Sequence, residues 1–130
     1  MDVDLLVIGW GKAGKTLAGR FAAAGKTVAL VERSPEMYGG TCINIGCVPT
    51  KDLVVSAEER RDSDDPQEFF RTAVAGRDAL IGTLNAANHQ MLEKPGVTLV
   101  DGTARFTGPR TVVVDTAECQ VELTGETVVI

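Results

Sequence analysis

The feature that most constrains this chain is a glycine-rich turn between a buried strand pattern and a helix pattern. Leu5–Ile8 is an unbroken apolar run, typical of a strand buried on both faces of a parallel sheet. The run Gly9–Gly14 follows at once, and a helix pattern with one apolar face then continues to Gly25, where glycine suits a C-cap. A second apolar run, Val28–Val31, completes a β-α-β unit. The sequence therefore predicts an α/β, Rossmann-like fold with a parallel sheet.

The glycine spacing, Gly-x-Gly-x-x-Gly, is that of a dinucleotide-binding turn. Gly9 suits a tight turn, Gly11 lets the backbone approach a pyrophosphate, and Gly14 permits close helix–strand contact. The N-terminus of the following helix would hold the phosphates. Glu32 lies 18 residues past Gly14, where a carboxylate can bond ribose hydroxyls and disfavours a 2′-phosphate, so NADP is a poor candidate for this pocket. The alternative is a glycine-rich turn without a ligand.

A second feature is the stretch Gly39–Lys51, which carries Cys42 and Cys47. On one regular helix their Cα atoms would lie roughly 8.6 Å apart, beyond the ~7 Å that a disulfide can span. A disulfide therefore requires an irregular backbone between them, which Gly46 permits. Lys51 follows Cys47 by four residues and would favour its thiolate. These features favour a redox pair.

Other interpretations of the two cysteines remain open at this point. They could be free, partly buried thiols, or a structural disulfide, although a bridge closing so short a loop adds little stability. No metal is expected, because Cys119 and His89 are not at ligand spacing. The N-terminus has no signal-peptide pattern, which indicates the cytoplasm, where a persistent cysteine pair is usually catalytic.

The rest of the chain predicts two helices and then strands. Pro49 suits the first turn of a helix running to about Arg61, and 67–94 forms a second helix whose apolar stripe should pack in the core. His89 is expected on its surface. Val97–Val100 should be a third parallel strand. The remaining strands are expected to form a β-meander with Cys119 facing inward, and they span 103–107, 111–115, 118–123 and 127–130.

Charge and hydropathy exclude several partners. The 130 residues carry a net charge of −5, which argues against nucleic acid or an anionic membrane as the main partner. No apolar stretch approaches the length of a membrane span.

Taken together, these motifs resemble the flavin-dependent pyridine nucleotide–disulfide oxidoreductases, a family that includes lipoamide dehydrogenase, glutathione reductase and mercuric reductase. The stretch Gly39–Lys51 is similar to the family's redox-disulfide signature throughout its length. Met37-Tyr38, the run 11–16 and Thr50 look most like the mercuric-reductase-like branch of reactive-chlorine defence, some members of which reduce hypothiocyanous acid. Trp10 and Lys12 depart from the small residues or proline that many members have.

The resemblance implies a role for each matching position. Cys42 would be the outer thiol that meets a small-molecule substrate, Cys47 would face the flavin, and Lys51 would lie by flavin N5. Glu32 would bind the adenosine ribose and Ala104 would touch the adenine. The other FAD contacts would come from two groups of residues, namely Gly9, Gly11, Lys12, Ala13 and Gly14, and Arg33, Gly40 and Thr41.

The family's electron route runs from NAD(P)H through FAD to the disulfide and on to the substrate. We therefore expect residues 1–130 to be the N-terminal part of a discontinuous FAD-binding domain. The NAD(P)-binding and dimerisation domains of a homodimeric parent enzyme would be absent, and apolar surface would be left exposed where they pack. This piece alone should lack turnover and should retain FAD weakly or not at all. The alternative is a stand-alone nucleotide-binding module without catalysis.

Overall fold

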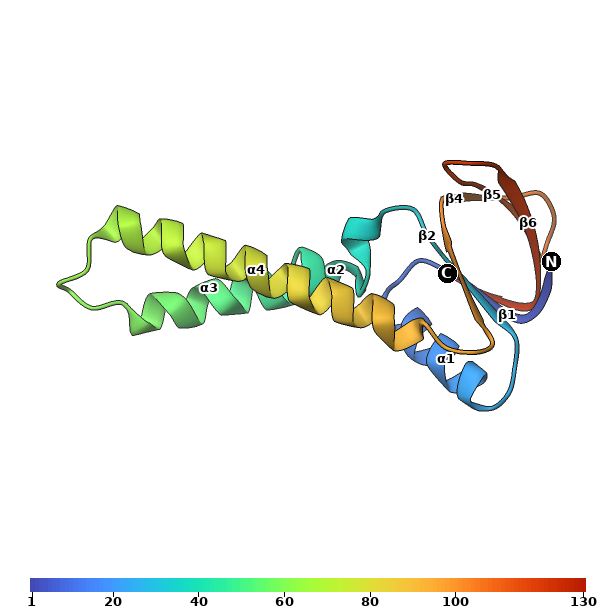
Figure 1. Cartoon of the computed structure of the whole chain (residues 1–130), viewed down its shortest axis with the longest axis horizontal. Helices are drawn as coiled ribbons and strands as arrows, with labels where there is room; N and C mark the ends of the chain where they lie inside the picture. Colours follow the sequence, from blue (N-terminus) through green and yellow to red (C-terminus); the bar gives the residue numbers. More distant parts are fainter.

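The computed structural model describes residues 1–130 and contains one mixed sheet with helices on one side and a projecting helical hairpin (Figure 1). The elements in chain order are β1 (Asp2–Ile8), α1 (Lys12–Ala23), β2 (Val28–Glu32), η1 (Pro35–Met37), α2 (Gly40–Asn44), α3 (Cys47–Glu59), α4 (Pro66–Leu92), β3 (Val97–Asp101), β4 (Thr103–Phe106), β5 (Thr111–Asp115) and β6 (Gln120–Val129).

The six strands lie in the order β3-β2-β1-β6-β5-β4. β1 pairs in parallel with β2 and β6, and β2 pairs in parallel with β3, which confirms the predicted β-α-β unit and third parallel strand. β4, β5 and β6 pair antiparallel as a meander. The predicted α/β, Rossmann-like class is therefore confirmed.

Two hydrophobic clusters lie on opposite faces of the sheet, because alternate residues of β1 and β2 point to opposite sides. On one face, Leu5, Val7 and Leu30 pack with Ala18 of α1 and Leu92 of α4. The other cluster contains Val3, Leu6, Ala29, Val31, Val112, Val114 and Leu123, so the meander supplies its cover. β1 and β2 are thus buried on both sides, as their apolar runs predicted.

The end of the chain differs from the sequence prediction. Residues 118–123 and 127–130 were expected to be two strands separated at Gly125, but one continuous strand, β6, runs from Gln120 to Val129. Gly125 is buried within it, and a Cβ there would lie 2.7 Å from the Cβ of Leu6, so this glycine permits close packing and not a turn. Cys119 was predicted to face inward, but it is exposed in the turn before β6.

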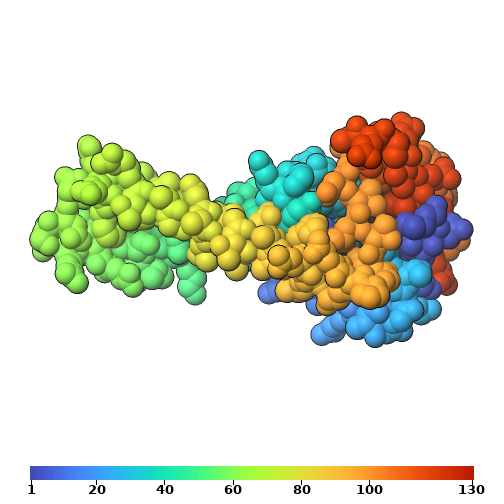
Figure 2. Space-filling view, in the orientation of Figure 1, coloured from blue at the N-terminus to red at the C-terminus, as the bar shows by residue number.

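Helices α3 and α4 form an antiparallel hairpin that extends away from the sheet (Figures 1 and 2). The prediction that the apolar stripe of α4 is core was wrong, because only Asn88 and Leu92 are buried in this helix. Phe70 is 63% exposed and Met91 is 53% exposed. The sheet end of α4 packs on α1 and α2, whereas its outer turns meet only α3. None of the helices combines the length and the apolar composition that a membrane span requires.

Candidate functional site

The glycine turn after β1 has the geometry that its spacing predicted. Gly9 has φ +96°, a conformation that side chains disfavour, and its amide donates to the carbonyl of Val31 at 2.8 Å. Gly14 lies where α1 crosses β1, and a Cβ there would lie 2.7 Å from Cγ1 of Val7. The turn therefore brings the N-terminus of the 12-residue α1 to the carboxyl end of β1.

A cavity of about 440 Å³ opens at this end of the sheet, which is where ligands bind in open α/β sheets. Its lining comes from the glycine turn, the end of β2, the start of α2 and the start of β4. Seven of the predicted cofactor residues line it, namely Gly9, Gly11, Glu32, Arg33, Gly40, Thr41 and Ala104. The sequence analysis missed six further lining residues, which are Ile8, Trp10, Val31, Met37, Gly102 and Thr103.

Glu32 is held in a fixed orientation at the end of β2. One carboxylate oxygen accepts the backbone N–H of Trp10 at 2.9 Å, and the other accepts the N–H of Ser34 at 3.2 Å. The residue is only 8% exposed yet lines the cavity. A carboxylate has about four acceptor sites, so two backbone bonds leave acceptors for hydroxyl groups of a ligand.

The cysteine stretch has the irregular backbone that a bridge requires. Cys42 lies on α2, which ends at Asn44, and Cys47 is the first residue of α3. Gly46, with φ −106° and ψ −87°, separates the two helices, and its amide donates to the carbonyl of Thr41 at 2.8 Å. Cys42 is half-buried and Cys47 is exposed.

The two thiols interact with each other. A hydrogen bond with Cys47, followed by burial, raises the pKa of the Cys42 thiol, while the charges of Lys12 and Lys15 act in the opposite direction. Cys47 lies at a helix N-terminus, where the helix dipole favours negative charge. Lys51 lies one turn further along the same helix, and its side chain is exposed. The geometry thus brings the two thiols together, with the charges of Lys12 and Lys15 within reach of Cys42.

One close contact joins the cysteine stretch to the glycine turn. Gly40, the first residue of α2, has φ +74°, and a Cβ there would lie 2.9 Å from Cα of Gly11 and 3.2 Å from the carbonyl oxygen of Trp10. Backbone packs on backbone at this point. Helix α2, which carries Cys42, therefore starts directly against the turn that lines the cavity.

Not every predicted residue lies at the cavity. Gly14 faces β1 from within α1, and Lys12 and Ala13 lie on the outer side of the first turn of α1, where they line a different, shallow depression. Cys42, Cys47 and Lys51 lie beyond its rim and are absent from its lining.

An aromatic cluster connects the site to α4, and the sequence analysis missed it. Trp10 is 1% exposed, stacks on His89 with ring centroids 5.7 Å apart, and lies 4.6 Å from the ring of Tyr38. His89 was predicted to be a surface residue, but it packs against both rings and pairs with Glu93 at 3.1 Å. The sequence did not indicate this aromatic contact, because a single histidine near the end of a helix pattern does not show which residues pack against it.

Asparagines of α4 also hold the cysteine stretch. Asn44 donates to the carbonyls of Tyr38 and Gly40, both at 2.9 Å. Asn85 donates to the side-chain oxygen of Asn44 at 3.2 Å. Asn88 accepts a hydrogen bond from the ammonium of Lys15. Asn85 thus ties α2 to α4, and Asn88 ties α4 to α1.

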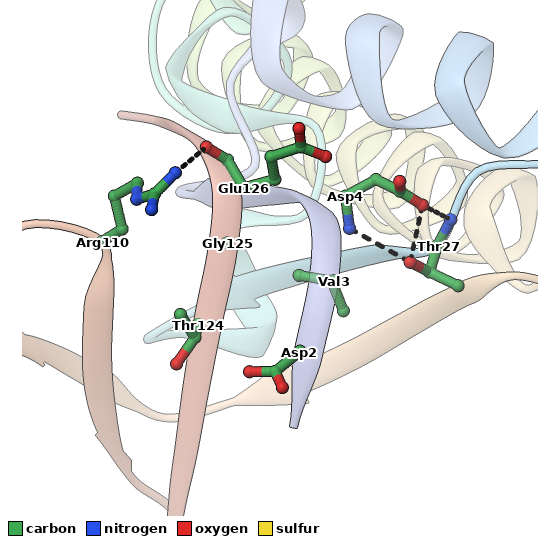
Figure 3. A pocket seen from close by; sticks show the side chains of 8 residues that line it. All are labelled: Asp2, Val3, Asp4, Thr27, Arg110, Thr124, Gly125 and Glu126. Carbon is green, nitrogen blue, oxygen red and sulfur yellow. Dashed lines mark hydrogen bonds between the residues drawn. The ribbon is translucent and has the colours of Figure 1, made fainter.

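A second cavity, of about 410 Å³, lies at the opposite edge of the sheet (Figure 3). It contains none of the predicted site residues, and its lining consists of Asp2, Val3, Asp4, Thr27, Arg110, Thr124, Gly125 and Glu126. Hydrogen bonds between Asp4 and Thr27, and from Arg110 to the carbonyl of Glu126, occupy much of its polar surface (Figure 3). This edge carries the amino ends of the parallel strands, so it is not the ligand edge of the fold.

The fold and the site define a dinucleotide-binding α/β unit with a cysteine pair beside its ligand cavity. Comparison with known proteins gives the family. Residues 3–130 match the pyridine nucleotide-disulphide oxidoreductase family, and the chain belongs to it.

The relatives agree with the branch that the sequence indicates. The chain is 41% identical over 126 residues to the probable pyridine nucleotide-disulfide oxidoreductase RclA of Escherichia coli strain K12, covering 96% of this chain and 27% of RclA. A solved Cu(II) complex of the HOCl-induced flavoprotein disulfide reductase RclA from E. coli superposes with a TM-score of 0.90 at 39% identity, over 100% of this chain and 28% of that one. Glutathione reductase of Schizosaccharomyces pombe is 39% identical, covering 86% of this chain and 26% of the enzyme. The chain thus spans about a quarter of the length of these relatives, all of which are named as oxidoreductases or reductases.

Proposed function

We propose that this chain is the FAD-binding, disulfide-bearing part of an NAD(P)H-dependent disulfide oxidoreductase. The observation that supports this best is the contact of Gly40 with Gly11, because it joins the cysteine helix to a dinucleotide-type cavity. A nucleotide module with incidental cysteines has no need for that contact.

The residues present fit FAD. At Gly9 and Gly11 no side chain covers the backbone, and a Cβ there would meet nothing within 4 Å. A pyrophosphate can therefore approach the backbone of the glycine turn closely. Glu32 offers free acceptor sites for ribose hydroxyls, and Ala104 and Thr103 of β4, which line the cavity, would contact the adenine. Bound FAD would supply two-electron transfer between a nicotinamide and the cysteine pair.

The cysteines carry the exchange chemistry in this proposal. For a disulfide substrate, the thiolate of Cys42 attacks one sulfur, the substrate disulfide breaks, and a mixed disulfide forms. The thiolate of Cys47 then attacks the sulfur of Cys42, which releases the second substrate thiol and leaves the Cys42–Cys47 disulfide. Two electrons pass to the substrate, and its two sulfurs take up the protons that the cysteines lose. Lys51 would hold positive charge beside the flavin ring.

The parent enzyme would contain more than this chain. We infer that residues 1–130 form the N-terminal part of a discontinuous FAD-binding domain, and that NAD(P)H-binding and dimerisation domains complete a cytoplasmic homodimer. The substrate would be a small oxidant, a disulfide or a metal ion, because relatives over this segment are named as glutathione reductase and mercuric reductase.

The test is an FAD titration of the purified chain. Trp10 is the only tryptophan and lines the cavity, so its fluorescence reports binding after correction for absorption by FAD. Because this piece should hold FAD only weakly, we expect quenching that saturates only at high FAD concentration and that weakens further in Glu32→Gln. The matched control is Glu122→Gln, since Glu122 is an exposed carboxylate on β6.

The same sample tests the cysteine pair. Partial reduction of the flavin complex should give a long-wavelength absorption band that disappears in Cys47→Ser and persists in Cys119→Ser. Equal FAD affinity of parent and Glu32→Gln, or a band insensitive to Cys47, would contradict the proposal. FAD binding without any effect of Cys47 would favour the nucleotide-binding module.

A further inference from the structure

Asn44 lies between the two cysteines in the chain, and both polar atoms of its amide are hydrogen-bonded. It is the last residue of α2 and is half-buried. Its amide nitrogen donates to the carbonyl of Tyr38 and to the carbonyl of Gly40, both at 2.9 Å. Its amide oxygen accepts a hydrogen bond from Nδ2 of Asn85 at 3.2 Å. Because an amide nitrogen carries two donors and both are used here, the orientation of the Asn44 side chain is fixed.

The partners of Asn44 are themselves fixed to the rest of the fold. The hydroxyl of Tyr38 lies 2.8 Å from each carboxylate oxygen of Asp101, the last residue of β3. The amide nitrogen of Asn85 also donates to the carbonyl of Pro35 at 3.1 Å. The amide of Asn44 therefore ties the end of α2 to the sheet through Tyr38 and to α4 through Asn85.

The backbone bonds of the turn between α2 and α3 are local. The carbonyl of Thr41 accepts the N–H of Ile45 at 3.0 Å and the N–H of Gly46 at 2.8 Å, and α3 begins at the next residue, Cys47. These bonds shape the turn but do not fix it relative to the sheet. Between the two cysteines, Asn44 is the residue whose side chain hydrogen-bonds to groups outside that segment.

The stability of a disulfide depends on how often its two thiols meet in a suitable geometry. The Cα atoms must come within about 7 Å, and the torsion about the S–S bond has a narrow preferred range. The thiols of Cys42 and Cys47 lie close enough for a hydrogen bond between them, which raises the pKa of Cys42. A backbone that holds them there has already lost the freedom that would separate them, which raises the effective concentration of one thiol at the other.

We propose that Asn44 lowers the reduction potential of the Cys42–Cys47 pair by holding the end of α2 in place beside the start of α3. Loss of its hydrogen bonds frees Cys42 to move relative to Cys47, so the disulfide becomes easier to reduce. Asn44 is a positioning residue, since it acts through the cysteines. The importance of this effect for turnover rests on the proposed function, whereas the thiol–disulfide equilibrium itself requires no flavin.

The test measures that equilibrium in a Cys119→Ser background, in which Cys42 and Cys47 are the only thiols. The chain is equilibrated with reduced and oxidised dithiothreitol in graded ratios. As the S–S bond forms, the pair passes two electrons and two protons to oxidised dithiothreitol, which becomes the dithiol. Acid quenching, alkylation of the remaining thiols with N-ethylmaleimide and mass spectrometry then give the oxidised fraction.

Two alanine variants should shift the equilibrium by different amounts. Asn44→Ala removes the bonds to Tyr38, Gly40 and Asn85 and should lower the equilibrium constant for disulfide formation about tenfold. For a two-electron couple, this is a rise in reduction potential of about 30 mV. Asn85→Ala leaves the two bonds that Asn44 donates and should lower the constant about two- to threefold.

Two controls separate positioning from a general effect on the fold. Gln90→Ala removes an exposed amide from the same helix as Asn85 and should leave the potential unchanged. Gly125→Ala should destabilise the fold at β1, away from the cysteine stretch. It should lower the free energies of unfolding of the dithiol and disulfide forms equally, so the potential should again keep the parent value.

A parent potential retained in Asn44→Ala, with native circular dichroism, overturns the proposal. A shift of equal size in Gly125→Ala also overturns it, because a general loss of stability would then account for the effect. If Asn44→Ala fails to fold, the comparison of Asn85→Ala with Gln90→Ala decides. A parent chain that forms no disulfide contradicts the proposed function as well, whereas a parent disulfide whose potential is independent of Asn44 contradicts this inference alone.

Discussion

Replacement of Gly40 by alanine tests whether the cysteine helix and the glycine turn are packed as one unit. Gly40 has φ +74°, and the added Cβ would lie 2.9 Å from Cα of Gly11 and 3.2 Å from the oxygen of Trp10. Both contacts are with backbone, so no side chain can rotate away. Either α2 or the glycine turn must move.

The magnitude follows from two separate effects. An alanine held in the left-handed region costs roughly 1–2 kcal/mol relative to glycine. Overpacking against a fixed neighbour adds about 1–3 kcal/mol. We therefore expect Gly40→Ala to lower the free energy of unfolding by about 2–5 kcal/mol, a large share of the stability of a domain of this size.

Two other glycines provide matched controls. Gly25 has φ +77° with nothing within 4 Å of a Cβ, so Gly25→Ala should show the backbone effect alone, about 1–2 kcal/mol. Gly76 lies in the middle of α4 with open space around it, so Gly76→Ala should stabilise by about 0.5–1 kcal/mol. Gly40→Ala should therefore lower the free energy of unfolding most, Gly25→Ala should lower it less, and Gly76→Ala should raise it.

Urea unfolding followed by circular dichroism at 222 nm measures all three free energies under one set of conditions. The reasoning is refuted if Gly40→Ala destabilises no more than Gly25→Ala, because the contact with Gly11 would then contribute nothing. A loss confined to FAD affinity, with unfolding unchanged, would also contradict it.

Three further changes have defined outcomes. Hydrogen bonds from Thr27, with help from Lys26, lower the pKa of Asp4 to about 2. The ionised carboxylate therefore stabilises the fold fully above the pKa of Asp4 in the unfolded chain, near 4, and this stabilisation is lost as pH falls through about 2. Asp4→Asn should flatten the dependence of Tm on pH between these two values. Gly125→Ala should destabilise by about 1–3 kcal/mol in urea unfolding, because its Cβ would lie 2.7 Å from β1. Tyr38→Phe should lower the free energy of unfolding at neutral pH by about 1.5–3 kcal/mol, because the hydroxyl bond of Tyr38 to the Asp101 carboxylate, 2.8 Å, is lost.

The sequence predicted the elements that depend on local periodicity and on special glycines. The β-α-β unit, the irregular backbone at Gly46 and the helix beginning near Pro49 follow from such patterns. The sequence misplaced Gly125, because a glycine that permits close packing looks the same as a glycine that makes a turn. Distinguishing the two requires knowing that Leu6 lies opposite, which is a tertiary contact.

The apolar stripe of α4 was misread for a different reason. Periodicity shows that one face of a helix is apolar but not what covers that face. In the structure the sheet end of α4 is buried through Leu92, while Phe70 near its outer end is exposed. The contacts that matter most for the site come from Asn85 and Asn88, and these polar side chains carry no hydrophobic signal, although Asn88 falls on the apolar face between Leu84 and Leu92.

The position of those asparagines explains why the hairpin can hold the cysteines precisely although it is mostly exposed. A helix that projects from a domain has few tertiary contacts and should open more easily than the sheet. Here the contacts concentrate at the sheet end, where Asn85 bonds Asn44 and Asn88 bonds Lys15. Because Asn44 in turn bonds the carbonyls of Tyr38 and Gly40, the geometry of the cysteine helix depends on the inner turns of α4 and not on its outer ones. Substitutions near Phe70 should therefore leave the rate at which iodoacetamide alkylates Cys42 unchanged, whereas Asn85→Ala should alter that rate, because Asn44 then loses its partner on α4.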